Sequence, residues 1–344
     1  IAFKKGENKE LREQMNAFLA KIKENGEFDE LHEKWFGDAE PTEFLSFDNL
    51  TGTNGTIKVA TAADVKPFAY IKDGKLAGYD MEMMILFAQE YGYQLEVTNM
   101  NFSAILAGVT SGSYDIGISG FTITEERKES VDFSDTYHQE DVIFCITGDE
   151  TENAGFMESI KESFEKTFIR ESRWKLIVEG VMITLIISVF AVLGGTALGF
   201  GLYLLARSSK QAISKTTKMF AKVYSKIIAG TPTLVILMIL FYVVFGKTNL
   251  SGVVVAIIGF ILTFASFVYG QLELTVEAVD YGQTEAAYAL GYSRNQTFFR
   301  IVLPQAMKMF IPTYSGEIVG LIKATSVVGY IAVNDLTKMG DIIR

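Results

Sequence analysis

Cysteine and histidine are scarce in this chain of 344 residues, which contains one cysteine and two histidines. The lone Cys145 cannot form an internal disulfide, and His32 and His138 lie too far apart in the sequence to suggest a Cys/His metal cluster. We therefore expect no metal site and no cofactor, and we expect both histidines to lie on the solvated surface.

Positive charge is deficient in the first half of the chain. Residues 1–173 contain 17 Lys and Arg against 33 Asp and Glu, whereas residues 174–344 contain 14 against 8. Because nucleic-acid binding needs clustered cations, this balance excludes nucleic acid as a partner. With 49% apolar and 21% charged residues, the chain is too apolar for one soluble domain and too charged for a bundle lying wholly in a membrane. We expect a soluble acidic part followed by a membrane part.

The first 38 residues are typical of the end of a domain. Residues 8–36 are predicted to form two helical pieces separated by Gly26, with Gly37 ending the second. Residues 39–55 have the turn-rich composition of a linker. The chain begins at Ile1 without a signal peptide, so we interpret it as a fragment. The apolar residues of the first piece recur at helical spacing and predict one buried face: Leu11, Met15, Phe18, Leu19 and Ile22.

Residues 56–147 alternate short apolar runs with amphipathic stretches, which predicts a β/α lobe. Residues 148–173 follow as a polar connector whose amphipathic pattern suits the approach to a membrane. The expected strands are 57–61, 94–98, 115–119 and 142–147, and the expected helices are 81–91, 103–111 and 124–130.

Uncharged windows long enough to cross a membrane begin after this connector, since about 20 apolar residues span the hydrocarbon core. A fourth window, 309–333, contains Glu317 and Lys323 and should face protein or a water-lined cavity rather than lipid. We thus expect four spans. The three windows without Asp, Glu, Lys or Arg are residues 180–206, 227–246 and 248–272.

Loop charge predicts the orientation of these spans. Residues 207–226, between the first two spans, carry six cations and no acid, which places them in the cytoplasm by the positive-inside rule. The acidic lobe is then outside, in the extracellular or periplasmic space, and so is the turn 246–252. The long polar segment 273–308 is cytoplasmic, where a partner can dock.

The segment 273–308 contains a spaced pattern. Glu285-Ala286-Ala287 is followed four residues later by Gly291, and Ile-Val-Leu-Pro begins ten residues beyond that glycine. From the residues alone this is an interhelical loop with a short helix, a glycine break, a second helix and a proline at the start of the next span. The pattern resembles the coupling loop of ABC importer permeases. The resemblance implies that a separate ATP-binding subunit docks here, and it assigns the coupling positions Glu285, Ala286, Ala287, Gly291, Leu303 and Pro304.

Segments 173–176, 230–235, 323–327 and 332–336 are similar to the polar amino acid permeases of this family. The resemblance implies an all-α transmembrane domain over 174–344 that works as a homodimer or heterodimer and continues into a fifth span after Arg344. The chain departs from the family pattern at Gly270, Glu273 and Ala324, so no intramembrane substrate contact is carried over.

No ATPase motif is found. The string 246–248, Gly-Lys-Thr, lacks the first glycine of a P-loop because Phe241 stands in its place. We therefore assign ATP hydrolysis to another subunit and expect no catalytic residue in this chain.

Five segments of the outer lobe carry further motifs: 67–70, 78–80, 101–103, 120–127 and 132–137. They resemble lobe 1 of periplasmic-type amino acid binding proteins. A guanidinium forks onto a carboxylate, so by position we assign Arg127 to the α-carboxylate of the ligand. Thr122 and the backbone of Ser119 and Gly120 are expected beside it, and Phe102 is expected over the side chain of the ligand.

Simpler interpretations of these residues stay open. Arg127 is also compatible with a surface salt bridge to Glu125, Glu126 or Asp132, and Phe102 with a core position. Related binding proteins close two lobes around the ligand, but this chain passes from 142–147 to the membrane. We expect residues 56–147 alone to bind weakly or not at all, and we interpret residues 1–38 as the C-terminal remnant of another such domain.

The sequence thus predicts a multi-domain protein in which an α/β periplasmic-binding-protein-like lobe precedes an all-α ABC importer permease bundle. The expected function is transport of a polar or charged amino acid across a bacterial plasma membrane, with the amino acid left open. Two alternatives are a sensing receptor and a ligand-gated channel. For the channel, residues 325–330 resemble a potassium filter, but Ile331 replaces its final glycine and the coupling loop stays unexplained.

Overall fold

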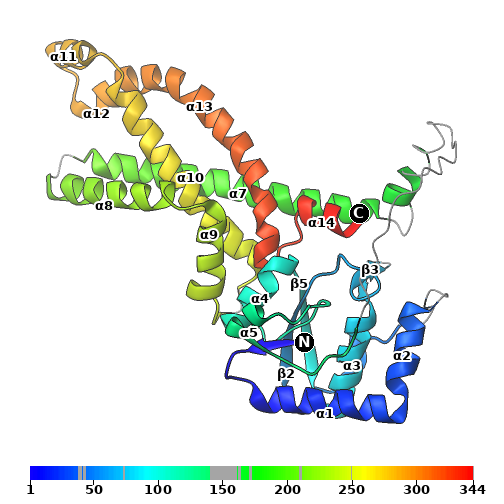
Figure 1. Cartoon of the computed structure of the whole chain (residues 1–344). Helices are drawn as coiled ribbons and strands as arrows, with labels where there is room; N and C mark the ends of the chain where they lie inside the picture. The colour runs from blue at the N-terminus through cyan, green and yellow to red at the C-terminus, as the bar shows by residue number, and fades with distance from the viewer. Residues whose placement is uncertain are drawn as a thin grey trace. The chain divides into compact units, whose positions relative to one another are not determined.

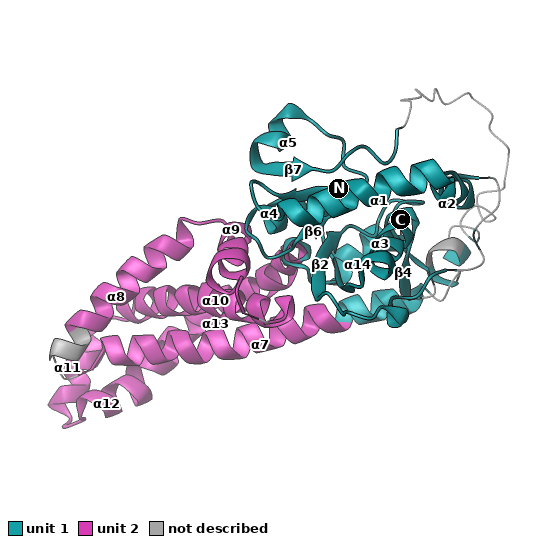
Figure 2. Cartoon of the chain, turned by 90° about the horizontal axis from the view of Figure 1, so that it is seen from below, with its two compact units in different colours: residues 1–181, 329–344 teal, residues 182–328 magenta. Residues whose placement is uncertain are grey.

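The structure is a computed structural model that describes residues 1–37, 41, 44–72, 74–139, 161, 164–169, 173–208, 211–248 and 250–343. It divides into two compact units, drawn in different colours in Figure 2. Unit 1 contains residues 1–181 and 329–344, and unit 2 contains residues 182–328. The expected strand 142–147 and most of the connector 148–173 lie outside the described residues.

Unit 1 is built on a five-stranded sheet of order β5-β2-β6-β1-β7. Strand β2 runs parallel to β5 and β6, with Ile57 opposite Leu95 and Val59 opposite Ile116. Strand β1 runs antiparallel to β6 and β7. A separate hairpin joins β3 (Tyr70–Lys72) to β4 (Lys75–Ala77). The sheet strands are β1 (Ala2–Lys4), β2 (Thr56–Thr61), β5 (Gln94–Asn99), β6 (Ile116–Gly117) and β7 (Val131–Phe133).

Helices α1 and α2, from the first 38 residues, and α3, from the lobe, share one core with this sheet (Figure 1). The edge of the Phe18 ring packs on Phe87 with 5.7 Å between ring centroids. Trp35 Nε1 donates to Glu82 Oε2 at 2.8 Å, which satisfies a buried indole. The helices are α1 (Lys9–Asn25), α2 (Glu27–Phe36), α3 (Tyr79–Tyr91), α4 (Phe102–Thr110) and α5 (Glu125–Ser130), with a 3₁₀ turn η1 (Phe47–Asn49).

The expected elements of the lobe are confirmed where they were long. The buried residues of α1 are Met15, Phe18, Leu19 and Ile22, as the helical spacing predicted. The expected strand 115–119 is reduced to the two residues of β6. Strands β1, β3, β4 and β7 were not predicted, because three residues are too few to show a two-residue alternation.

Unit 2 is helical and is organised around α10 (Gly252–Glu277), which packs on α8, α9 and α13. Helix α7 also approaches α10 closely through glycine. A Cβ on Gly199 would lie 2.6 Å from the carbonyl oxygen of Ala265, so a larger residue cannot stand there. The other helices of unit 2 are α8 (Gln211–Ala229), α9 (Thr233–Met238), η4 (Ile239–Val244), α11 (Tyr281–Ala289), α12 (Arg294–Thr297), η5 (Phe298–Val302) and α13 (Leu303–Ala324). Helices α7 (Trp174–Ala206) and η6 (Thr325–Ile331) belong partly to each unit, and η2 (Glu165–Ile169) and α14 (Leu336–Ile343) belong to unit 1.

Among the described residues, α7 and α10 are long and apolar enough to cross a membrane, and up to four spans result if each bent helix pair counts as one. The expected span 227–246 is not one straight helix. Helices 215–229 and 233–244 meet at 107°, at a break that contains Gly230 and Pro232. The expected fourth span corresponds to α13 and η6, and a break separates η6 from α14.

Candidate ligand cavity and coupling loop

A cavity of about 650 Å³ lies in unit 1 beside the carboxyl ends of the parallel strands. In open α/β sheets this edge is the usual place for a ligand, because loops from neighbouring strands converge there. The chain after β2 supplies Val65 and Phe68, the chain after β5 supplies Phe102, and the chain after β6 supplies residues 119–123.

The predicted ligand residues come together at this cavity. Phe102, Ser119, Gly120 and Thr122 line it directly. Arg127 lies behind its wall: the guanidinium carbon is 5.8 Å from the ring centroid of Phe102 and 5.7 Å from that of Phe121. Its Nη1 donates to the carbonyl oxygen of Thr122 at 2.7 Å. The five assigned residues therefore form one constellation, with Arg127 one layer out.

Two of the three acids considered as salt-bridge partners of Arg127, Glu125 and Asp132, bond other cations. Lys128 Nζ lies 2.7 Å from Glu125 Oε1. Asp132 is 3.3 Å from Lys5 and 3.2 Å from Arg12, with the N–H of Gly6 donating to it as well. This hydrogen bond and the two cations lower the pKa of Asp132 below its ordinary value. The half-buried Arg127 is thus directed at the cavity wall.

Phe102 forms part of the wall and is not a core residue. Its side chain is 37% exposed, and its ring centroid lies 4.8 Å from that of Phe121. The two rings, tilted by 31° to each other, present an apolar surface to the cavity with a cation beside them. That combination suits a ligand with an apolar body and a carboxylate.

Asp80 supports the cavity from within the core and was not assigned from the sequence. Its side chain is fully buried, and it accepts hydrogen bonds from Tyr137 Oη at 2.9 Å and from the N–H of Gly120 at 3.2 Å. Burial raises the pKa of Asp80 to about 7, although the bond from Tyr137 opposes this. The N–H of Gly120 expected to bind the ligand thus donates to Asp80 in this structure.

Gly78 explains how Asp80 reaches this position. Its φ of 136° and the 2.2 Å between a hypothetical Cβ and the carbonyl oxygen of Phe68 leave room only for glycine. Helix α3 therefore begins against the cavity loop, and the N–H of Asp80 donates to Phe68 O at 2.9 Å. The Gly78-Tyr79-Asp80 motif was the signal in the sequence that pointed to this residue.

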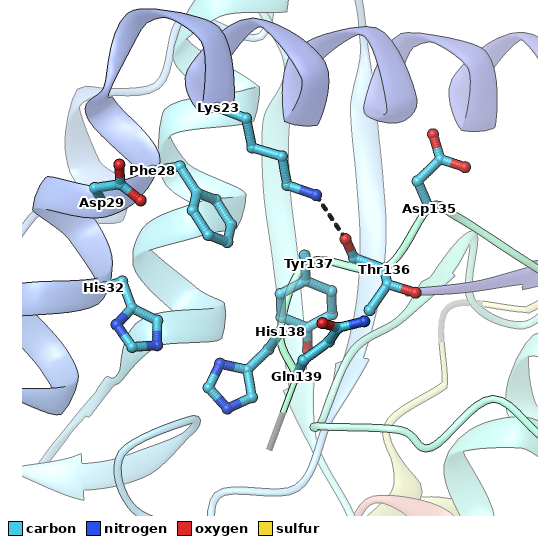
Figure 3. Close-up of a pocket in the computed structure, with 9 residues that line it drawn as sticks. All are labelled: Lys23, Phe28, Asp29, His32, Asp135, Thr136, Tyr137, His138 and Gln139. Carbon is cyan, nitrogen blue, oxygen red and sulfur yellow. Dashed lines mark hydrogen bonds between the residues drawn. The ribbon is translucent and has the colours of Figure 1, made fainter. Parts of the chain in front are cut away.

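A second cavity of about 610 Å³ is shown in Figure 3, bounded by α1, α2 and residues 135–139. Lys23 reaches across it and donates to the carbonyl oxygen of Thr136 at 2.7 Å. The expectation that both histidines are solvated is wrong, because His32 and His138 are half-buried. Each imidazole stacks with the Phe36 ring, at 4.6 and 4.5 Å between centroids, and the two imidazoles stack with each other at 5.4 Å. Among the described residues no group of three metal-binding side chains is found.

The loop 273–308 has the predicted form in unit 2. Helix α11 ends at Ala289, and Gly291 follows with φ 81°, a left-handed conformation that lets the chain turn into α12. Glu285 and Ala286 are exposed, whereas Ala287 is 1% exposed and packs inward. Leu290 at the turn is 78% exposed. Leu303 and the exposed Pro304 begin α13.

Comparison with known proteins identifies both parts of the chain. Residues 3–38 and 57–229 match the bacterial extracellular solute-binding proteins, family 3, and residues 197–344 match the binding-protein-dependent transport system inner membrane component. The probable amino-acid ABC transporter permease protein YckA of Bacillus subtilis is 35% identical over 168 residues, which are 48% of this chain and 73% of that protein.

One further relative matches a shorter stretch of the sequence, and one solved structure is similar to part of the chain. The arginine-binding extracellular protein ArtP of Bacillus subtilis is 40% identical over 80 residues, 23% of this chain and 31% of ArtP. A crystal structure of an amino acid ABC transporter with histidines covers 55% of this chain and 82% of its own at 26% identity and a TM-score of 0.45. The chain therefore belongs to the inner membrane permeases of binding-protein-dependent ABC transporters, and it carries a solute-binding segment of family 3 fused ahead of the permease.

Proposed function

We propose that this chain is the permease subunit of an importer for a polar or charged amino acid. Relatives named as amino-acid permeases and as an arginine-binding protein match its two parts, which supports this substrate class. Two permease copies, identical or different, form the translocation path in the plasma membrane. A separate ATP-binding subunit supplies the energy.

The coupling loop carries this proposal. An exposed glutamate and alanine stand on a short helix, next to a strongly exposed Leu290, and Ala287 anchors that helix inward. A surface of this kind, apolar at its tip with a charge beside it, suits docking to another subunit. The six cations of residues 207–226 support a cytoplasmic location for this loop and, with it, a lobe outside the cell.

The cavity in the lobe is proposed to receive the ligand. Arg127 is the proposed cation for the α-carboxylate of a ligand that packs on Phe102. Because Arg127 lies one layer behind the wall with Nη1 on the carbonyl oxygen of Thr122, its guanidinium must turn toward the cavity to reach the ligand. Ser119 and Gly120 also line the cavity, although the N–H of Gly120 already donates to Asp80 at 3.2 Å. Asp135 supplies the one carboxylate among the described lining residues, and we expect tight binding to require a second lobe.

The channel alternative receives no support from residues 325–331. They form the 3₁₀-helix η6, whose i→i+3 hydrogen bonds use backbone carbonyls, and the carbonyl oxygen of Gly329 accepts from the N–H of Asn101. We therefore retain the importer.

Substitution of Glu285 tests the proposal. The natural full-length protein, co-expressed with candidate ATP-binding subunits, is expected to capture one of them and to import amino acid. Glu285→Ala should reduce uptake about tenfold or more, since a charged contact at an interface is lost. Glu24→Ala, at an exposed glutamate of α1, is the matched control and should leave uptake unchanged. Normal uptake by Glu285→Ala, with no ATP-binding subunit captured, would refute the importer.

A further inference from the structure

Arg207, the first residue after α7, contacts the coupling loop inside unit 2. Its guanidinium carbon lies 3.9 Å from the ring centroid of Phe298. Its Nη2 donates to the carbonyl oxygen of Arg294 at 3.1 Å, and Nη2 of Arg294 donates to the carbonyl oxygen of Arg207 at 2.8 Å. We name Arg207, Arg294 and Phe298 the arginine clasp. It joins positions 87 residues apart in the sequence.

The chemistry of the arginine clasp requires arginine at position 207. A guanidinium is planar, so it stacks on a ring and donates to a carbonyl at the same time, whereas a lysine ammonium offers no plane. The Phe298 ring is 1% exposed and is therefore fixed by its surroundings. The carbonyl that Arg294 binds lies just after the last turn of α7, where carbonyls lack partners within the helix and favour a cation.

Rigid neighbours hold the arginine clasp on both sides. A capping box fixes the start of α12: the N–H of Ser293 donates to Gln296 Oε1 at 2.9 Å, and the N–H of Gln296 donates to Ser293 Oγ at 3.4 Å. One turn before Arg207, the Tyr203 ring lies 6.0 Å from Phe298 and 6.4 Å from Tyr269 of α10. Motion of α12 is thus passed on rather than absorbed by a loose loop.

We propose that the arginine clasp transmits displacement of the coupling loop to the first span, which makes Arg207 a positioning residue for ATP-driven transport. The inference rests on the proposed function, because an ATP-binding subunit must push α11 and α12. The loop is covalently joined to α10 and α13 only. The arginine clasp adds α7 as a third helix that moves with it.

The test compares transport with ATP hydrolysis in the same vesicles. The full-length protein and its ATP-binding subunit are reconstituted in proteoliposomes, and amino acid uptake per ATP hydrolysed is measured. Arg207→Gln should lower this ratio about fivefold or more while the ATP-binding subunit stays bound. Arg207→Lys should lower the ratio by a similar factor, since lysine keeps the charge but not the planar guanidinium. Phe298→Leu should also lower the ratio. The double variant Arg207→Gln with Phe298→Leu should have a ratio no lower than that of either single variant, because both changes remove the same contact.

Lys226→Gln is the matched control, since it removes an exposed cation of α8, and it should keep the wild-type ratio. An unchanged ratio in Arg207→Gln overturns the proposal, and so does full additivity of the two single variants. If Arg207→Gln does not assemble, the uptake ratio of Phe298→Leu decides the test, because this variant keeps the charge of Arg207. A wild-type protein that binds no ATP-binding subunit would contradict the proposed function instead.

Discussion

Arg127 is held beside the cavity by groups from its own turn. Thr124 Oγ1 accepts from the N–H of Arg127 at 3.3 Å and caps α5, and the carbonyl oxygen of Thr122 fixes the guanidinium. The cation is therefore held next to the cavity wall before a ligand arrives. Preorganisation of this kind lowers the entropy that binding must overcome.

Arg127→Ala is expected to weaken amino acid binding by about tenfold or more, because it deletes a charge-assisted hydrogen bond to the carboxylate. Lys128→Ala is the matched control: Lys128 neighbours Arg127 but pairs with Glu125 at 2.7 Å, so its loss should leave affinity unchanged. Isothermal titration calorimetry on the full-length protein measures both. Equal affinity in the two variants would remove Arg127 from the ligand site.

At this scale the sequence predicted positions better than contacts. Ser119, Gly120 and Thr122 follow one strand, and Phe102 follows its neighbour in the chain, so their convergence could be predicted from strand order. The partner of the Gly120 N–H could not be predicted in this way, because Asp80 belongs to α3 and reaches Gly120 only through the close turn at Gly78.

Helix α14 is joined to the loop after β2 by an ion pair inside unit 1. Lys338 Nζ lies 3.2 Å from Asp64 Oδ2, and the Lys338 side chain is 1% exposed. In addition the N–H of Asn101 donates to the carbonyl oxygen of Gly329 at 3.0 Å. A buried ammonium is tolerated only with such a partner, so α14 depends on Asp64.

Asp64→Asn should destabilise unit 1 by about 3 kcal/mol, because it leaves the ammonium of Lys338 buried without its carboxylate. Lys338→Met in the same chain should restore most of this loss, since it removes the unpaired charge at similar volume. Thermal unfolding of the purified protein measures both. Glu125→Gln, which breaks the exposed pair with Lys128, is the control and should cost less than about 1 kcal/mol. A loss of stability in Asp64→Asn as small as that of the control would contradict the dependence of α14 on Asp64.

Element prediction succeeded where a periodic pattern was long. The helical spacing of Met15, Phe18 and Ile22 identified α1, and the uncharged windows identified α7 and α10. The break in the second span was not identified, because Gly230 and Pro232 interrupt a window that hydropathy alone treats as continuous.

Across the whole molecule, the arrangement of segments was the least predictable feature. Residues 1–38 were expected to be the remnant of another domain. In the structure, β1 instead lies between β6 and β7 in the sheet of the lobe, and α1 and α2 pack on the same core. Strand pairing across more than 100 residues leaves no local mark in the sequence, since Ala2 meets Gly117 and Phe133. The charge contrast between the two halves is a non-local feature that the sequence does display.

The positive charge of residues 207–226, part of that contrast, predicts which ends of the helices face the cell interior. With Cys145→Ser as background, Leu290→Cys places a thiol at the exposed turn of the coupling loop, and Lys247→Cys places one at the exposed turn after η4. Because residues 207–226 carry six cations, the first thiol should be cytoplasmic and the second external. A membrane-impermeant maleimide added to intact cells should therefore label only Lys247→Cys, and permeabilised cells should label both. Labelling of Leu290→Cys in intact cells would reverse the topology and remove the basis for docking an ATP-binding subunit on this loop.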